Sequence, residues 1–165
     1  MIEQFAYLTK EEQDLIMDAP ALITAMVAAS DKEIDSKDKE IDSKEVERGL
    51  DLMKWKQFRA RPDLLNYYQE VSRQFPERLD ALLKKELPTD EANRNQQIEE
   101  RLRGLNKVLP KFDKEFAEQL YASYRELAKR VAESSGGVLG YLSINFNEAK
   151  LIKLPMIDDP RTYNV

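Results

Sequence analysis

The chain has 165 residues, of which 35% are charged and 42% hydrophobic, a balance typical of a single soluble domain. It contains no cysteine and no histidine, which excludes disulfides, thiolate chemistry and the usual zinc and copper ligands. A bound metal would therefore be a hard cation held by oxygen, such as calcium or magnesium. The net charge of -5 argues against nucleic-acid binding.

No signal for a targeting or membrane-spanning segment is found. The first residues lack the basic start and apolar stretch of a signal peptide. The apolar run from Ala19 to Ala29 is shorter than the roughly 20 residues that a transmembrane helix needs. We expect a cytoplasmic protein with no transmembrane segment, while association with a membrane surface stays open. Because no Gly/Ser or Pro-rich linker divides the chain, we expect one helical domain over 1–154 and an irregular tail over 155–165.

The first half of the chain predicts a series of helices. The capping box Thr9-Lys-Glu-Glu12 predicts a helix beginning at Thr9. Pro20 either kinks this helix or starts a new one, and the apolar run from Ala19 predicts a central, buried helix. Further helices are expected over 43–59, from Pro62 and again from Pro76, where apolar residues recur at three- and four-residue intervals.

The second half continues the pattern. Thr89 is expected to cap a polar helix with a stripe of leucines, and a clean amphipathic helix is expected from Phe112 to Val131, ending near Gly136. A short last helix is expected over 147–154. The fold class is therefore all-α, a single compact bundle of about seven helices.

Residues with catalytic potential do not stand out. Acids and lysines are abundant, but no spacing selects a pair, so we name no catalytic and no cofactor-binding residue. The paired tyrosines Tyr67 and Tyr68, and Tyr121 with Tyr124, are expected at core edges with their hydroxyls in water. Basic and aromatic residues alternate around Trp55, which we interpret as a helix end rather than a nucleic-acid surface.

One acidic segment has a more specific pattern. Residues 31–45 repeat the unit Asp-Lys-Glu-Ile-Asp-Ser-Lys twice in tandem and then end in Glu45, with a net charge of -3. Carboxylates spaced in this way can converge on a hard cation. The spacing does not fit an EF-hand, because Ser36 stands where that loop needs glycine and Asp42 where it needs glutamate. A solvated helix extension is the alternative, since seven residues nearly preserve helical phase and Ile34 and Ile41 would share a face.

The residues around this segment resemble a known family. Val27 to Ile34 read Val-Ala-Ala-Ser-Asp-Lys-Glu-Ile, and Asp38, Ile41 and Glu45 repeat the spacing. The pattern of an alanine-rich helix, an aspartate, an isoleucine and a later acid resembles the TerB-like (tellurite-resistance TerB) family. The stretch from Ala128 to Gly137, followed by Glu148, is similar to the family's second motif. It has no aspartate before its glycine pair, so the resemblance assigns an ion site to the first motif only.

The resemblance implies an all-helical domain with two pseudo-symmetric halves, a stress-response setting and no catalytic role. It also implies a site for Ca²⁺ or another hard divalent cation, whose ligands we expect to be Asp31, Asp35, Asp38, Asp42 and Glu45. We therefore expect a non-enzymatic binding or scaffold module with protein partners and no nucleic acid. Two alternatives stay open: a purely structural protein–protein interaction domain without a metal, and a metal-dependent hydrolase that uses carboxylates.

Overall fold

The computed structural model describes residues 3–30, 61–135 and 150–163. In these ranges the chain is all-helical and contains no strand, as expected. Four helices of three turns or more form the bundle: α1 (Lys10–Ser30), α3 (Pro62–Ala81), α4 (Glu91–Arg103) and α6 (Lys114–Ser135). Shorter elements connect or flank them: the 3-10 helices η1 (Glu3–Tyr7), η4 (Leu109–Lys111) and η6 (Pro160–Thr162), the π-helix η3 (Leu82–Glu86), and α5 (Leu105–Val108).

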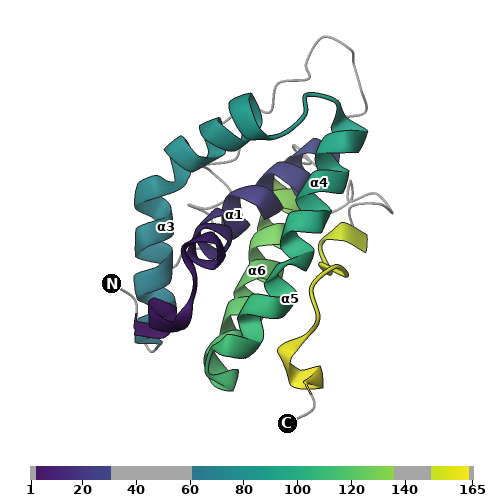
Figure 1. Cartoon of the computed structure of the whole chain (residues 1–165). Coiled ribbons are helices and arrows are strands. Elements are labelled where there is room, and N and C mark those ends of the chain that lie inside the picture. Colours follow the sequence, from purple (N-terminus) through teal and green to yellow (C-terminus); the bar gives the residue numbers. More distant parts are fainter. Residues whose placement is uncertain (1–2, 31–60, 136–149, 164–165) are drawn as a thin grey trace.

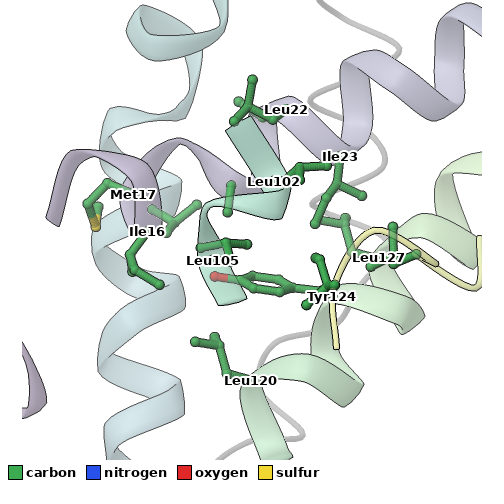
Figure 2. Close-up of a cluster of buried hydrophobic side chains, with 14 of the residues drawn as sticks. Ile16, Met17, Leu22, Ile23, Leu102, Leu105, Leu120, Tyr124 and Leu127 are labelled. Carbon is green, nitrogen blue, oxygen red and sulfur yellow. The ribbon is translucent and has the colours of Figure 1, made fainter. Parts of the chain in front are cut away.

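Helix α1 lies at the centre of the bundle. Figure 1 shows it between α3 on one side and α4 and α6 on the other, and it contacts all three. Every side chain from Ala19 to Val27 is buried, so the prediction of a central, buried helix is confirmed. Figure 2 shows Ile16, Leu22 and Ile23 of this helix packed with leucines of the neighbouring helices.

The expectation of about seven helices is wrong for the described part of the chain. A helix begins at Pro62, as expected, but Pro76 lies inside the same helix and does not begin a new one. Of the two possibilities at Pro20, a new helix is excluded, because Pro20 lies within continuous α1. Pro76 is exposed, and on an exposed face water can satisfy the carbonyl that loses its N–H donor. Figure 1 shows that α3 curves in its second half, as a helix bent by proline does. The helix expected over 43–59 lies outside the described residues. Of the helix expected over 147–154, residues 147–149 lie outside them, and helix is seen only at Lys150 and Leu151 before a turn at Ile152 and Lys153.

Pro20 is buried, so water cannot explain why α1 continues through it. A proline at position 20 has no N–H, and the carbonyl of Ile16, four residues earlier, therefore loses its helical donor. The hydroxyl of Tyr67 in α3 donates a hydrogen bond to this carbonyl at 2.7 Å. A buried carbonyl without a partner costs about 1–3 kcal/mol. The Tyr67 hydroxyl thus replaces the missing N–H, and α1 passes through the proline unbroken.

The same hydroxyl joins α6 to the other two helices. Because the hydrogen of Tyr67 is given to Ile16, its oxygen accepts from the hydroxyl of Tyr124, 2.8 Å away. Next to this pair, the hydroxyl of Tyr68 lies 2.6 Å from that of Ser123, which donates to the carbonyl of Leu120. Figure 2 shows the Tyr124 ring among buried leucines, with its hydroxyl turned toward the side where Ile16 lies.

The expectation that these tyrosine hydroxyls are in water is therefore wrong for Tyr67, Tyr68 and Tyr124, all of which are fully buried. Their hydroxyls find partners inside the protein, which lets them be buried without a large penalty. Burial raises the pKa of all three phenols above the ordinary value, so they stay neutral over the physiological pH range.

Of the two helix caps predicted from the sequence, one is confirmed and one is displaced by a residue. The capping box at the start of α1 is confirmed: the N–H of Glu12 donates to Thr9 Oγ1 at 3.1 Å and the N–H of Thr9 donates to Glu12 Oε1 at 3.0 Å. The same carboxylate forms an ion pair with Lys111, whose Nζ lies 2.7 Å from Oε2. The expected cap at Thr89 is wrong by one residue, because Asp90 accepts the N–H of Asn93 and begins α4. Threonine and aspartate both cap helices well, so the sequence alone does not show which of the two residues begins the helix.

The apolar stripes of the other helices are confirmed. Their residues are all buried in the common core: Leu64, Tyr68, Val71 and Phe75 of α3; Ile98, Leu102, Leu105 and Leu109 of α4, α5 and η4; and Phe116, Leu120, Tyr124, Leu127 and Val131 of α6. Gly104 separates α4 from α5 at a close approach, since a Cβ there would lie 3.2 Å from Leu15 Cδ2 of α1. In the described residues, no helix is long and apolar enough to cross a membrane.

Replacing Tyr67 by phenylalanine tests the role of its hydroxyl. The change leaves the Ile16 carbonyl and the Tyr124 hydroxyl without partners, so we expect the free energy of unfolding to fall by about 1–3 kcal/mol. Chemical denaturation measures this value. Tyr7→Phe, at a tyrosine that is 83% exposed, is the control and should change stability little.

A double-mutant cycle with Pro20→Ala isolates the proline's part. An alanine at position 20 supplies an N–H to the Ile16 carbonyl, so Tyr67→Phe should cost about 0.5–1.5 kcal/mol less in that background. Equal costs in both backgrounds would show that the hydroxyl does not compensate for the proline.

The capping box predicts a pH dependence. The ion pair with Lys111 and the hydrogen bond from the Thr9 N–H lower the pKa of Glu12 below its ordinary value of 4.5. A lowered folded-state pKa stabilises the protein above the unfolded-state pKa, and this contribution is lost as pH falls through the folded-state pKa. The stability advantage of the wild type over Glu12→Gln should therefore be full at about pH 7 and shrink below 4.5.

Denaturation curves at several pH values measure this difference. Glu11→Gln, which removes the neighbouring carboxylate of the same turn, is the control for the loss of a charge. A wild-type advantage that stays constant down to about pH 3 would contradict the prediction.

Candidate functional site

The acidic residues predicted to bind a cation cannot be located in the fold. All of them lie outside the described residues: Asp31, Asp35, Asp38, Asp42 and Glu45. The same holds for Trp55 and for Gly136 and Gly137. Over residues 3–30, 61–135 and 150–163, no three acidic side chains come together in a way that could hold a metal ion. The cation site therefore stays a prediction.

A groove with charged walls lies elsewhere, between α6 and the segment that begins at Lys150. It has a volume of about 720 Å³, within the usual range for small-molecule sites. Four cationic side chains line it, Arg125, Lys129 and Arg130 from α6 and Lys153 from the opposite wall.

The remaining lining residues are two carboxylates, Glu126 and Glu133, and two apolar side chains, Ala122 and Ile152. The four cations and two carboxylates give the walls an excess of two positive charges. On a chain with a net charge of -5, this groove is a local region of the opposite sign.

The cations differ in how far they are neutralised. Arg130 forms an i,i+4 ion pair with Glu126, with 3.4 Å between Nη2 and Oε1. Arg125, Lys129 and Lys153 form no ion pair among the described residues. The guanidinium of Arg125 lies over the ring of Tyr121, 5.8 Å from its centroid, which orients it without cancelling its charge. None of these three charges is neutralised by an ion pair among the described residues; Arg125 lies near enough to Asp159 that its charge helps to lower the pKa of that carboxyl.

Helix α6 presents these side chains because of its amphipathic pattern. Leu120, Tyr124, Leu127 and Val131 are buried against the core. Arg125, Lys129 and Glu133 follow one another at four-residue intervals, so they form a second stripe that faces away from the core. The buried stripe fixes the rotation of the helix, and this rotation places the cations at the groove.

The opposite wall is held in place by the segment from Leu154 to Thr162. Figure 1 shows this segment running beside α4 and α5. Met156 and Ile157 are buried. The side chain of Asn106 in α5 forms two hydrogen bonds with the backbone on either side of Ile157: its amide nitrogen donates to the carbonyl of Met156 at 3.1 Å, and its oxygen accepts the N–H of Asp158 at 2.8 Å. These contacts hold this part of the tail against the bundle. Leu154 turns the chain with a positive φ of 50°.

This groove was not predicted from the sequence, although one of its two walls has a recognisable pattern. The spacing of Arg125 and Lys129 on an amphipathic helix could have indicated a basic stripe. Lys153 and Ile152 could not be connected with it, because their position depends on the path of the chain after Leu154.

Comparisons with known proteins provide no further guide. The chain matches no model of a protein family, no curated protein sequence and no solved structure.

Removing the Asn106 side chain should loosen the second wall of the groove. Asn106→Ala deletes two hydrogen bonds, each contributing about 0.5–1.5 kcal/mol, and we expect faster proteolysis after residue 154. Limited proteolysis followed by mass spectrometry locates the cuts. Asn93→Ala, on an exposed side chain of α4, is the control. Unchanged cleavage in the Asn106 variant would show that the buried side chains alone hold this segment.

Proposed function

We propose that the protein is a non-enzymatic binding or scaffold module of the TerB-like type, with a divalent-cation site in residues 31–45. The observation that carries the proposal is the arrangement of the two helices that end in the family's motifs. Helix α1 is described as far as Ser30, the residue before Asp31, and α6 as far as Ser135, the residue before the glycine pair. These two helices pack against each other.

The packing supports a design of two related halves, which the resemblance implies. A helix buried from Ala19 to Val27 gives the acidic segment a rigid starting point, as an ion-binding loop requires. Under this proposal Asp31, Asp35, Asp38, Asp42 and Glu45 supply oxygen ligands to Ca²⁺ or a similar ion. The protein would act in the cytoplasm through protein partners in a stress response. A purely structural interaction domain without a metal is the competing proposal that the metal test below decides.

Titration of CaCl₂ and MgCl₂ into the chelator-treated full chain tests the ion site. A ligand that binds only the folded state stabilises it by about 2.7 kcal/mol at a hundredfold excess over the dissociation constant. We therefore expect calorimetric heat and a rise in the unfolding temperature with Ca²⁺. Absence of both at millimolar ion would remove the metal and leave the structural interaction domain.

Two variants separate a built site from general attraction to acidic residues. Asp31→Asn/Asp38→Asn removes one proposed ligand from each copy of the repeated unit. Glu33→Gln/Glu40→Gln removes one carboxylate from each copy that is not a proposed ligand, with the same change in charge. The first pair should abolish the heat and the second should preserve most of it. Equal loss in both pairs would indicate diffuse electrostatic binding.

A further inference from the structure

We propose that the groove between α6 and Ile152–Lys153 binds a small organic phosphate. It differs from the cation site proposed for residues 31–45 in its residues and in the charge of its ligand, and it rests only on described residues. Its volume of about 720 Å³ is enough for a ligand of nucleotide size. Both walls contribute cations, Arg125 and Lys129 from α6 and Lys153 from the other side.

The number and placement of the cations favour a multiply charged anion. Arg125 and Lys129 are one helical turn apart, with Cβ atoms about 5–6 Å from each other, and Lys153 lines the same groove from another segment of the chain. A single carboxylate has one charge and would leave most of this positive charge unpaired. A phosphate ester has close to two charges and three acceptor oxygens, and it can accept from an arginine and two lysines at once.

The other lining residues indicate what the rest of the ligand is like. Ala122 and Ile152 offer aliphatic surface, against which an apolar or ring-shaped group can pack. Glu133, which forms no ion pair among the described residues, can accept hydrogen bonds from hydroxyl or amino groups of the ligand. A sugar phosphate or nucleotide combines these features, whereas inorganic phosphate satisfies only the cations.

The charge of the whole chain favours a small ligand over a large one. The protein has a net charge of -5, so an extended polyanion or an anionic membrane that spreads beyond the groove meets repulsion. A small anion remains within about 8 Å of the three cations, the distance over which charges interact at physiological salt. The groove thus attracts a compact phosphate without attracting nucleic acid or lipid surfaces.

Calorimetric titration of the full chain with pyrophosphate and with ADP tests the proposal. EDTA is present, so the result does not depend on the cation site. We expect dissociation constants below about 1 mM that weaken as salt is raised. Lys129→Gln/Lys153→Gln removes one cation from each wall, at exposed side chains without ion pairs, and should weaken binding by more than about tenfold.

The matched control is Lys10→Gln/Lys114→Gln, which makes the same change in charge at two exposed lysines outside the groove. It should bind like the wild type. No binding of either phosphate, or equal weakening in both variants, would overturn the proposal. A poly-glutamate peptide and vesicles containing phosphatidylserine serve as comparison ligands, and binding of either one in place of the phosphates would overturn it as well.

Discussion

The hydrogen bond from Tyr67 to the carbonyl of Ile16 is the interaction on which the rest of the bundle depends. Pro20 lies in the most deeply buried part of the central helix, where water cannot satisfy the carbonyl that the proline leaves without a donor. A hydroxyl from α3 fills this role, and the same oxygen accepts from Tyr124 of α6. One buried chain of hydrogen bonds therefore joins α1, α3 and α6. Because burial raises the pKa of these phenols, their hydroxyls keep their hydrogens and go on donating these hydrogen bonds.

The buried hydrogen bonds also determine which side chains of α6 lie at the surface. Tyr124 is fixed by Tyr67 on the buried side of the helix, and its sequence neighbour Arg125 lies at the groove. The rotation of α6 that satisfies the buried hydroxyls is thus the rotation that exposes Arg125 and Lys129. The other wall has an independent support, since Asn106 and the buried Met156 hold the segment that follows Lys153. A groove whose two walls are both fixed by buried contacts is suited to bind a ligand without large rearrangement.

The sequence predicted those features that local chemistry determines. The capping box at Thr9 and the apolar stripe of α6 both involve residues within a few turns of each other, and both are confirmed. The effect of Pro20 on α1 was harder to predict, because the Tyr67 hydroxyl that replaces the missing N–H is 51 residues away from Ile16 along the chain. The groove was missed for a similar reason, since nothing local connects Lys153 with Arg125. Long-range contacts of this kind depend on the finished fold, while caps and stripes do not.

The sequence gathers acidic residues in one segment, and the described structure gathers cations at the groove. Residues 31–45 have a net charge of -3 and follow α1, whereas the unpaired cations lie on α6 and at Lys153. Within the groove, Glu126 is already engaged by Arg130, so its charge does not cancel those of Arg125 and Lys129. Lys129 and Glu133 are spaced i,i+4 on α6 and both line the groove, but they form no ion pair with each other among the described residues. An exposed i,i+4 ion pair contributes only about 0.3–0.5 kcal/mol, so leaving Lys129 and Glu133 unpaired costs α6 little and leaves both side chains able to contact a ligand.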